Sequence, residues 1–448
     1  MARIRSSAPF LFLGVGLVAL GIAGPVRSVD AGRSTTEPFS LKLLENYLGR
    51  REASGRPIRT IPELLSSLKS GEMTELDPMD QRSFFLAWTA VHHSQSRQYA
   101  SPENPRILMR SSTGKFIMAF TGEPGSDSEN LEVIELNPRS KKWEFAEVRF
   151  DGSRPEVERK GAGAEAKDCV GCHQGRPNWH SYRIWPGVFK SNDDVTYRNT
   201  REYADRQAFI QKIRDGRDPK YAMLDLRYFE MDEPPHTNTN FSVWLGRANF
   251  ERIARILSES PRFRNYQYAL LAAVTGCSEI ESFLPASVRS QRHSKSLRSL
   301  FDETRRAHEE YYRERLEALG DNRKQDGEIP DIEKNHGARI AAIRYVVQGM
   351  GLDRPGERIE DWSMSPGSGK TFAFQSGFFS INRLDIPLAR EMLERGGLTD
   401  TKFEREVRSI ADGSMSAFGG YSGGTSGDYS ESGEGCRVLR GKSLQAFR

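Results

Sequence analysis

The chain has 448 residues, of which 37% are hydrophobic, and its formal net charge at pH 7 is +4. This length allows two or three domains, or one core with large elaborations. The modest charge and the scattered Lys and Arg residues argue against a nucleic-acid-binding surface. No segment after the N-terminus is apolar enough to cross a membrane. We therefore expect no nucleic-acid partner and no integral membrane span once a signal peptide is removed.

The N-terminus has the pattern of a signal peptide. Arg3 and Arg5 form a basic start, and an apolar run of about 14 residues follows over residues 10–23. This run is short for a membrane span and has the length of a signal-peptide core. We predict a signal peptide over residues 1–31, with an uncleaved anchor as the alternative. The mature protein is then expected to be periplasmic or secreted.

We predict a helical N-terminal region over residues 32–100. Two short helices are expected over residues 37–48 and 60–68. Thr60 is suited to the N-cap position of the second helix, and Glu63 three residues later completes a capping box.

A third, stronger helix is predicted to begin at Asp77-Pro78, because proline is favoured in the first turn of a helix. Its apolar residues include Phe84 and Leu86, and it is expected to end near residue 93.

Residues 101–160 are predicted to form a small antiparallel sheet. The expected strands make two hairpins, residues 106–110 with 116–121 and residues 131–136 with 143–150. Polar turns that contain glycine or proline separate the strands of each pair. About four strands follow from this pattern, and residues 151–167 are expected to be a linker.

The linker leads to C-x-x-C-H, formed by Cys169, Cys172 and His173. This is the spacing at which a chain takes up c-type haem covalently. Two thiols three residues apart can each add to a vinyl group of one porphyrin, and the adjacent imidazole can ligate the iron as proximal ligand. The alternatives are a zinc site, a dithiol redox pair or a chance occurrence of the motif, but zinc usually takes four ligands. We predict one covalent haem c.

The predicted haem-binding segment covers residues 161–235. Arg176 and Trp179 follow the motif and could bind the haem propionates, since a guanidinium presents a fork that suits carboxylates. The alternative is that Arg176 is a solvated loop charge and that Trp179 fills a packing gap.

The sequence does not identify the sixth iron ligand by a motif. We favour Met231, because it lies in the polar, proline-rich run 230–235, where a methionine has little structural purpose. The competing residues are Met223, His180, His92, His93 and His236. A vacant sixth position is a further alternative and would favour ligand binding or peroxide chemistry.

A helical domain is predicted over residues 236–411, with a Gly/Ser-rich tail over residues 412–448. From residue 198 onward, helices are expected over residues 201–214, 241–257, 266–276, 297–319, 340–347 and 388–393. Their apolar residues recur at helical spacing.

Cys277 and Cys436 are the two remaining cysteines. In an oxidising compartment, such a leftover pair suggests a disulfide, which would attach the tail to the helical domain. Two free thiols are the alternative.

The chain resembles a group of secreted bacterial proteins that carry one cytochrome c motif and have no assigned function. The likeness spans about residues 95–280 and lies in residues 105–107, 116–120, 169–173, 176–179, 185–187, 192–194 and 266–277. In related sequences a glycine commonly follows the histidine, whereas Gln174 stands here. The resemblance implies haem binding and is compatible with electron transfer, but it supplies no substrate.

These observations predict an α+β protein, mainly helical, with a small antiparallel sheet before a c-type haem-binding segment. One-electron transfer with a redox partner protein is the favoured function. The alternatives are a five-coordinate haem enzyme or ligand sensor, and an interaction protein with a structural haem. Whether the protein is an enzyme stays open.

Overall fold

The structure is a computed structural model. It describes residues 39–70, 79–87, 100–111, 113–121, 129–150, 154–161, 201–216, 219–221, 248, 250–306, 334–352, 384–412 and 434–448.

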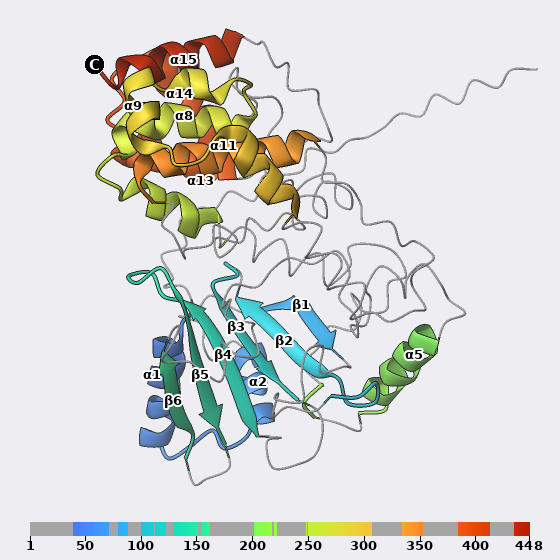
Figure 1. The fold of residues 1–448 in the computed structure, drawn as a ribbon. Helices are drawn as coiled ribbons and strands as arrows, with labels where there is room; N and C mark the ends of the chain where they lie inside the picture. Colours follow the sequence, from blue (N-terminus) through green and yellow to red (C-terminus); the bar gives the residue numbers. More distant parts are fainter. Residues whose placement is uncertain are drawn as a thin grey trace, which may run out of the picture. The chain divides into compact units, whose positions relative to one another are not determined.

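The chain has an α+β fold, as predicted (Figure 1). Six antiparallel strands pair in sequence order to form one sheet. They are β1 (Met79–Ala87), β2 (Arg106–Ser111), β3 (Phe116–Phe120), β4 (Asn130–Leu136), β5 (Trp143–Arg149) and β6 (Glu156–Gly161). Both predicted hairpins are confirmed as β2–β3 and β4–β5.

The helix predicted to begin at Asp77-Pro78 is wrong over the described residues, because Met79–Ala87 form strand β1. Phe84 lies opposite Met109, and Ala87 lies opposite Arg106. The local helix-start signal is overridden by lateral pairing with β2, which lies farther along the chain.

Strand β6 was also not predicted, since it falls in the expected linker. It pairs with β5, and Val157 lies opposite Val148. Its charged residues resemble a polar linker in sequence, but a neighbouring strand supplies partners for its backbone groups.

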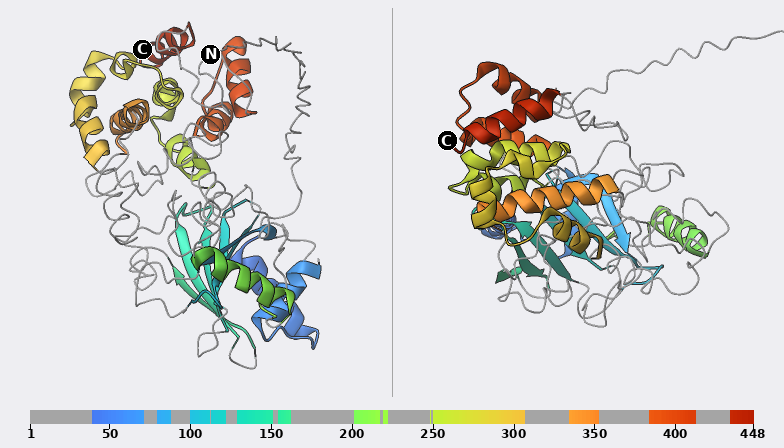
Figure 2. Two further views of the ribbon diagram at one scale, coloured as in Figure 1. Left: turned by 90° about the vertical axis from the view of Figure 1, so that its right-hand side faces the viewer. Right: turned by 45° about the horizontal axis from the view of Figure 1, so that its top comes forward.

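Helices α1 (Leu41–Ala53) and α2 (Ile61–Ser70) lie against one face of the sheet (Figures 1 and 2). Leu44 and Leu64 pack there with alternate strand residues such as Val133, since side chains on a strand alternate between its two faces.

The predicted capping box of α2 is confirmed. The Glu63 amide donates to Thr60 Oγ1 at 3.3 Å, and the Thr60 amide donates to Glu63 Oε2 at 3.2 Å.

Helix α5 (Arg201–Arg214) contributes to the same core as the sheet. The Phe209 ring meets the Tyr221 ring edge-on, with centroids 4.9 Å apart. The Tyr221 hydroxyl donates to the Pro105 carbonyl at 2.8 Å. These contacts hold the segment after α5 beside the start of β2.

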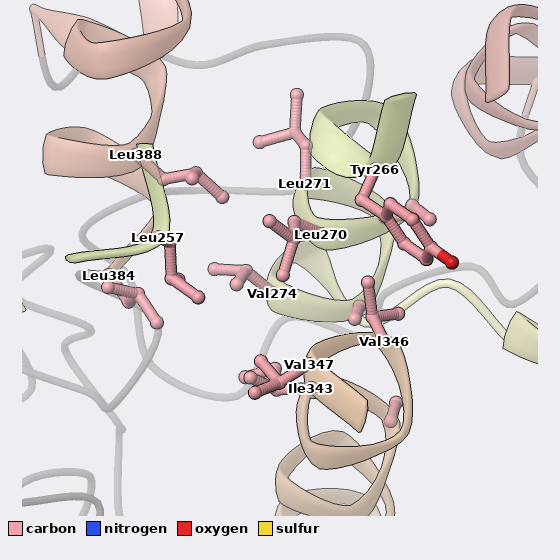
Figure 3. Close-up of a cluster of buried hydrophobic side chains, with 14 of the residues drawn as sticks. Leu257, Tyr266, Leu270, Leu271, Val274, Ile343, Val346, Val347, Leu384 and Leu388 are labelled. Carbon is pink, nitrogen blue, oxygen red and sulfur yellow. The ribbon is translucent and has the colours of Figure 1, made fainter. Parts of the chain in front are cut away.

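A second hydrophobic core belongs to the C-terminal helices. They are α8 (Phe263–Thr275), α9 (Ala286–Arg292), α11 (Lys334–Met350), α13 (Asp385–Arg395), α14 (Thr401–Ala411) and α15 (Glu434–Gln445), with the short 3-10 helix η2 (Ile280–Phe283) after α8. Helix α8 contacts α11, α13 and α15. Leu270 of α8, Val347 of α11 and Leu388 of α13 are all fully buried in this core (Figure 3).

The helices predicted in this part are confirmed where α8, α11 and α13 form, and residues 250–258 and 297–306 are also helical. Helix α14 was not predicted, and α15 lies in the expected Gly/Ser-rich tail. Helix α15 packs on α8 and buries Leu439, so that end of the chain belongs to the folded domain. Within the described residues, no helix combines the length and apolarity needed to cross a membrane.

Candidate functional site

The residues of the predicted haem site all lie outside the described residues. They are Cys169, Cys172, His173, Arg176, Trp179 and Met231. The competing distal ligands lie outside the described residues as well. In the chain, the motif follows β6, which ends at Gly161, and precedes α5, which begins at Arg201. The haem site therefore stays a prediction from sequence.

The other two cysteines form a disulfide, as predicted. Cys277 and Cys436 are joined with their Cα atoms 5.7 Å apart. Helix α8 ends at Thr275, and Gly276 takes the left-handed conformation with φ 86°. This cap turns the chain so that the Cys277 amide donates to the Ala272 carbonyl at 2.9 Å. The cap thus positions the Cys277 side chain, which is buried, against α15.

The disulfide limits what the remaining cysteines can do. The chain has four cysteines, and this bond uses two of them. Cys169 and Cys172 are the two left, and they stand at the C-x-x-C-H spacing. The donor set of two thiols and the adjacent His173 imidazole has the composition that covalent haem attachment requires.

A polar cluster in the helical part was not predicted. The His293 ring stacks on the Tyr345 ring with centroids 4.0 Å apart, and His293 Nε2 donates to the Tyr345 carbonyl at 3.0 Å. Burial lowers the pKa of His293 and raises the pKa of Tyr345. Both shifts favour the neutral form of the ring.

Tyr266 lies beside this pair. A Cβ added at Gly349 would be 2.6 Å from Tyr266 Cε1 and 3.1 Å from His293 Cε1. Burial also raises the pKa of the Tyr266 phenol. A neutral cluster of this kind joins α8, α11 and the segment after α9 by packing, so we assign it a structural role. The sequence held no signal for it, because its members lie on separate elements.

Within the described part of the chain, no group of three or more His, Cys, Asp or Glu residues could hold a metal ion. No protein-family model, curated protein or solved structure matches this chain.

Proposed function

We propose that this chain is an exported c-type cytochrome-like protein that binds one haem covalently and transfers single electrons. Cys169 and Cys172 would hold the haem through thioether bonds, and His173 would be the proximal iron ligand. The observation that carries the proposal is the Cys277–Cys436 disulfide, which leaves this pair as the two remaining cysteines.

The same disulfide supports the proposed location. Disulfides persist in oxidising compartments and are rare in the cytosol. The signal-peptide pattern at residues 1–31 points to the same compartment. In that environment, two unprotected thiols three residues apart would oxidise, whereas thioether bonds to haem would protect them.

Further residues would complete the site. The Arg176 guanidinium, with Trp179, would bind the propionates, and the Met231 thioether would be the sixth ligand. Bound haem supplies a one-electron couple whose potential depends on its axial ligands. A sixth protein ligand would exclude exogenous ligands, which favours electron transfer over ligand chemistry. A redox partner protein is then required, because the chain has a single haem motif.

Covalent attachment is tested with the full chain co-expressed with a c-type haem maturation system. We expect haem absorbance to stay with the polypeptide after denaturation and acid–acetone extraction. The double variant Cys169→Ser/Cys172→Ser should lose it. The matched control Cys277→Ser/Cys436→Ser should retain it, because its cysteines serve the disulfide. Wild-type protein that folds but carries no covalent haem would contradict the proposal.

The reduced-minus-oxidised spectrum, recorded with and without carbon monoxide, separates electron transfer from ligand chemistry. We expect carbon monoxide to leave the spectrum of the reduced wild-type protein unchanged. Met231→Ala should create a carbon monoxide-sensitive spectrum, and the control Met223→Ala should not. A wild-type spectrum that responds to carbon monoxide would favour the five-coordinate enzyme or sensor. Cys169→Ala removes one proposed haem attachment residue. If this variant keeps the cellular function, the alternative of an interaction protein is favoured over electron transfer.

A further inference from the structure

An open pocket of about 510 Å³ lies between the segment that contains η2 and α9 and the C-terminal helix α15. This volume is within the range of pockets that take small organic ligands. Two bonds join its walls. One is the Cys277–Cys436 disulfide, and the other is the hydrogen bond from Ser443 Oγ to the Phe283 carbonyl at 2.8 Å. The pocket is therefore an open hollow whose two sides are joined within the folded helical part.

Charges of both signs line this pocket. Arg289 of α9 and Arg440 of α15 supply two guanidinium groups, and Glu279 and Glu281 supply two carboxylates. Among the described residues, none of these four side chains forms an ion pair. A ligand that pairs with these groups would form charge-assisted hydrogen bonds, which the groups do not make within the described structure.

Two local features support a binding role. Ser282 lines the same pocket, and its hydroxyl oxygen is buried without a hydrogen-bond partner in the structure. A buried hydroxyl left unpaired costs free energy that a ligand group can recover. Glu279 has φ 52°, a left-handed conformation that is uncommon for a residue with a side chain and is often found at binding sites.

The pocket also has an apolar part. Leu284 and Leu444 line it together with the charged residues. A complementary ligand thus has an anionic group, a cationic group and a short apolar body. Arginine forks suit a carboxylate, and glutamates accept hydrogen bonds from an ammonium group.

We propose that this pocket binds an aliphatic α-amino acid. Arg289 and Arg440 receive its carboxylate, Glu279 and Glu281 receive its ammonium group, and its side chain lies on the leucines. This inference is independent of the haem proposal, because it uses only residues of the described helical part.

Isothermal titration calorimetry of the mature protein with L-leucine tests the proposal. Two analogues isolate the charges, since N-acetyl-L-leucine lacks the cation and L-leucinamide lacks the carboxylate. We expect L-leucine to bind and each analogue to bind roughly tenfold more weakly. Absence of L-leucine binding at millimolar concentration, or equal binding of all three compounds, would overturn the proposal.

Variants locate the site. Arg440→Gln and Glu281→Gln should each weaken L-leucine binding by roughly tenfold. Arg440→Gln should also narrow the difference in affinity between L-leucine and L-leucinamide, because the carboxylate then keeps only Arg289 as a partner. Arg437→Gln is the matched control, since this exposed residue lies on the same helix and does not line the pocket. If Arg437→Gln weakens binding as much as Arg440→Gln, the assigned site is wrong.

Discussion

Cys277, just after helix α8, is bonded to Cys436, in the first turn of α15, across a sequence separation of 159 residues. This bond attaches the C-terminal helix to the end of α8, which contacts α11, α13 and α15. The bond constrains the unfolded chain and so contributes to stability. It also leaves Cys169 and Cys172 as the two other cysteines of the chain.

The double variant Cys277→Ser/Cys436→Ser should lower the free energy of unfolding of the helical part by about 2–5 kcal/mol, because it frees a long loop in the unfolded chain. Guanidinium titration followed by far-UV circular dichroism measures this loss. Reductant should destabilise the wild-type protein by a similar amount and leave the variant unchanged. Equal stability of wild type and variant would mean that the bond does not constrain the unfolded chain.

Gly349 lies where no side chain fits. A Cβ there would be 2.6 Å from Tyr266 Cε1, too close for any real contact. Gly349→Ala should therefore destabilise the protein by about 1–3 kcal/mol, because the packed rings must move. The control is Gly441→Ala in α15, where nothing lies within 4 Å of the added Cβ. That change should stabilise by about 0.5–1 kcal/mol, since alanine favours helix over glycine. Thermal unfolding of both variants measures whether the two changes in stability have opposite signs.

Asp400 caps helix α14 and also pairs with α15. Its side chain accepts from the Lys402 and Phe403 amides at 3.0 and 3.1 Å, and Lys442 Nζ donates to Asp400 Oδ2 at 2.7 Å. The hydrogen bond from Lys442 is the largest cause that lowers the pKa of Asp400 to about 2. Because this pKa is depressed, the stabilising contribution is complete above the usual value of 3.8 and is lost as the pH falls toward 2.

A carboxyl-carbon NMR titration should find the Asp400 midpoint near 2. Lys442→Met should move the midpoint up, because it removes the main partner of the charged form. A midpoint that the variant leaves unmoved would show that Lys442 does not act on Asp400.

The pKa of Glu135 is shifted in the opposite direction from that of Asp400. Burial is the main cause that raises its pKa above 4.5, although Glu135 Oε2 accepts from the Leu41 amide at 3.3 Å. A raised carboxyl pKa means that the group favours folding below about 4.5 and that this contribution is lost as the pH rises through the folded-state pKa.

Glu135→Gln keeps an acceptor for the Leu41 amide and removes the buried charge. We expect the variant to be at least as stable as wild type at pH 7, with the difference shrinking at pH 4. Urea titrations at both pH values measure this. Glu156→Gln, on the exposed part of β6, is the control and should show no comparable change. A Glu135→Gln variant that loses stability only at pH 7 would contradict the expected sign.

Local signals in the sequence identified much of the fold. The capping box of Thr60 and Glu63 depends on residues three apart, and each hairpin depends on the turn between its strands. The C-x-x-C-H motif is equally local, so the proposed haem ligands required no structure. Such features are readable because their physical cause lies within a few residues.

Strand β1, strand β6, helix α15 and the mixed-charge pocket required the tertiary structure. Residues 79–87 carry a helix-start signal, yet they are a strand because β2 lies alongside. Residues 434–445 read as a polar tail, yet they are a helix that packs on α8 and is tied to it through Cys436. In each case the deciding interaction comes from a partner segment elsewhere in the chain, and burial and backbone pairing with that partner outweigh weak local propensity.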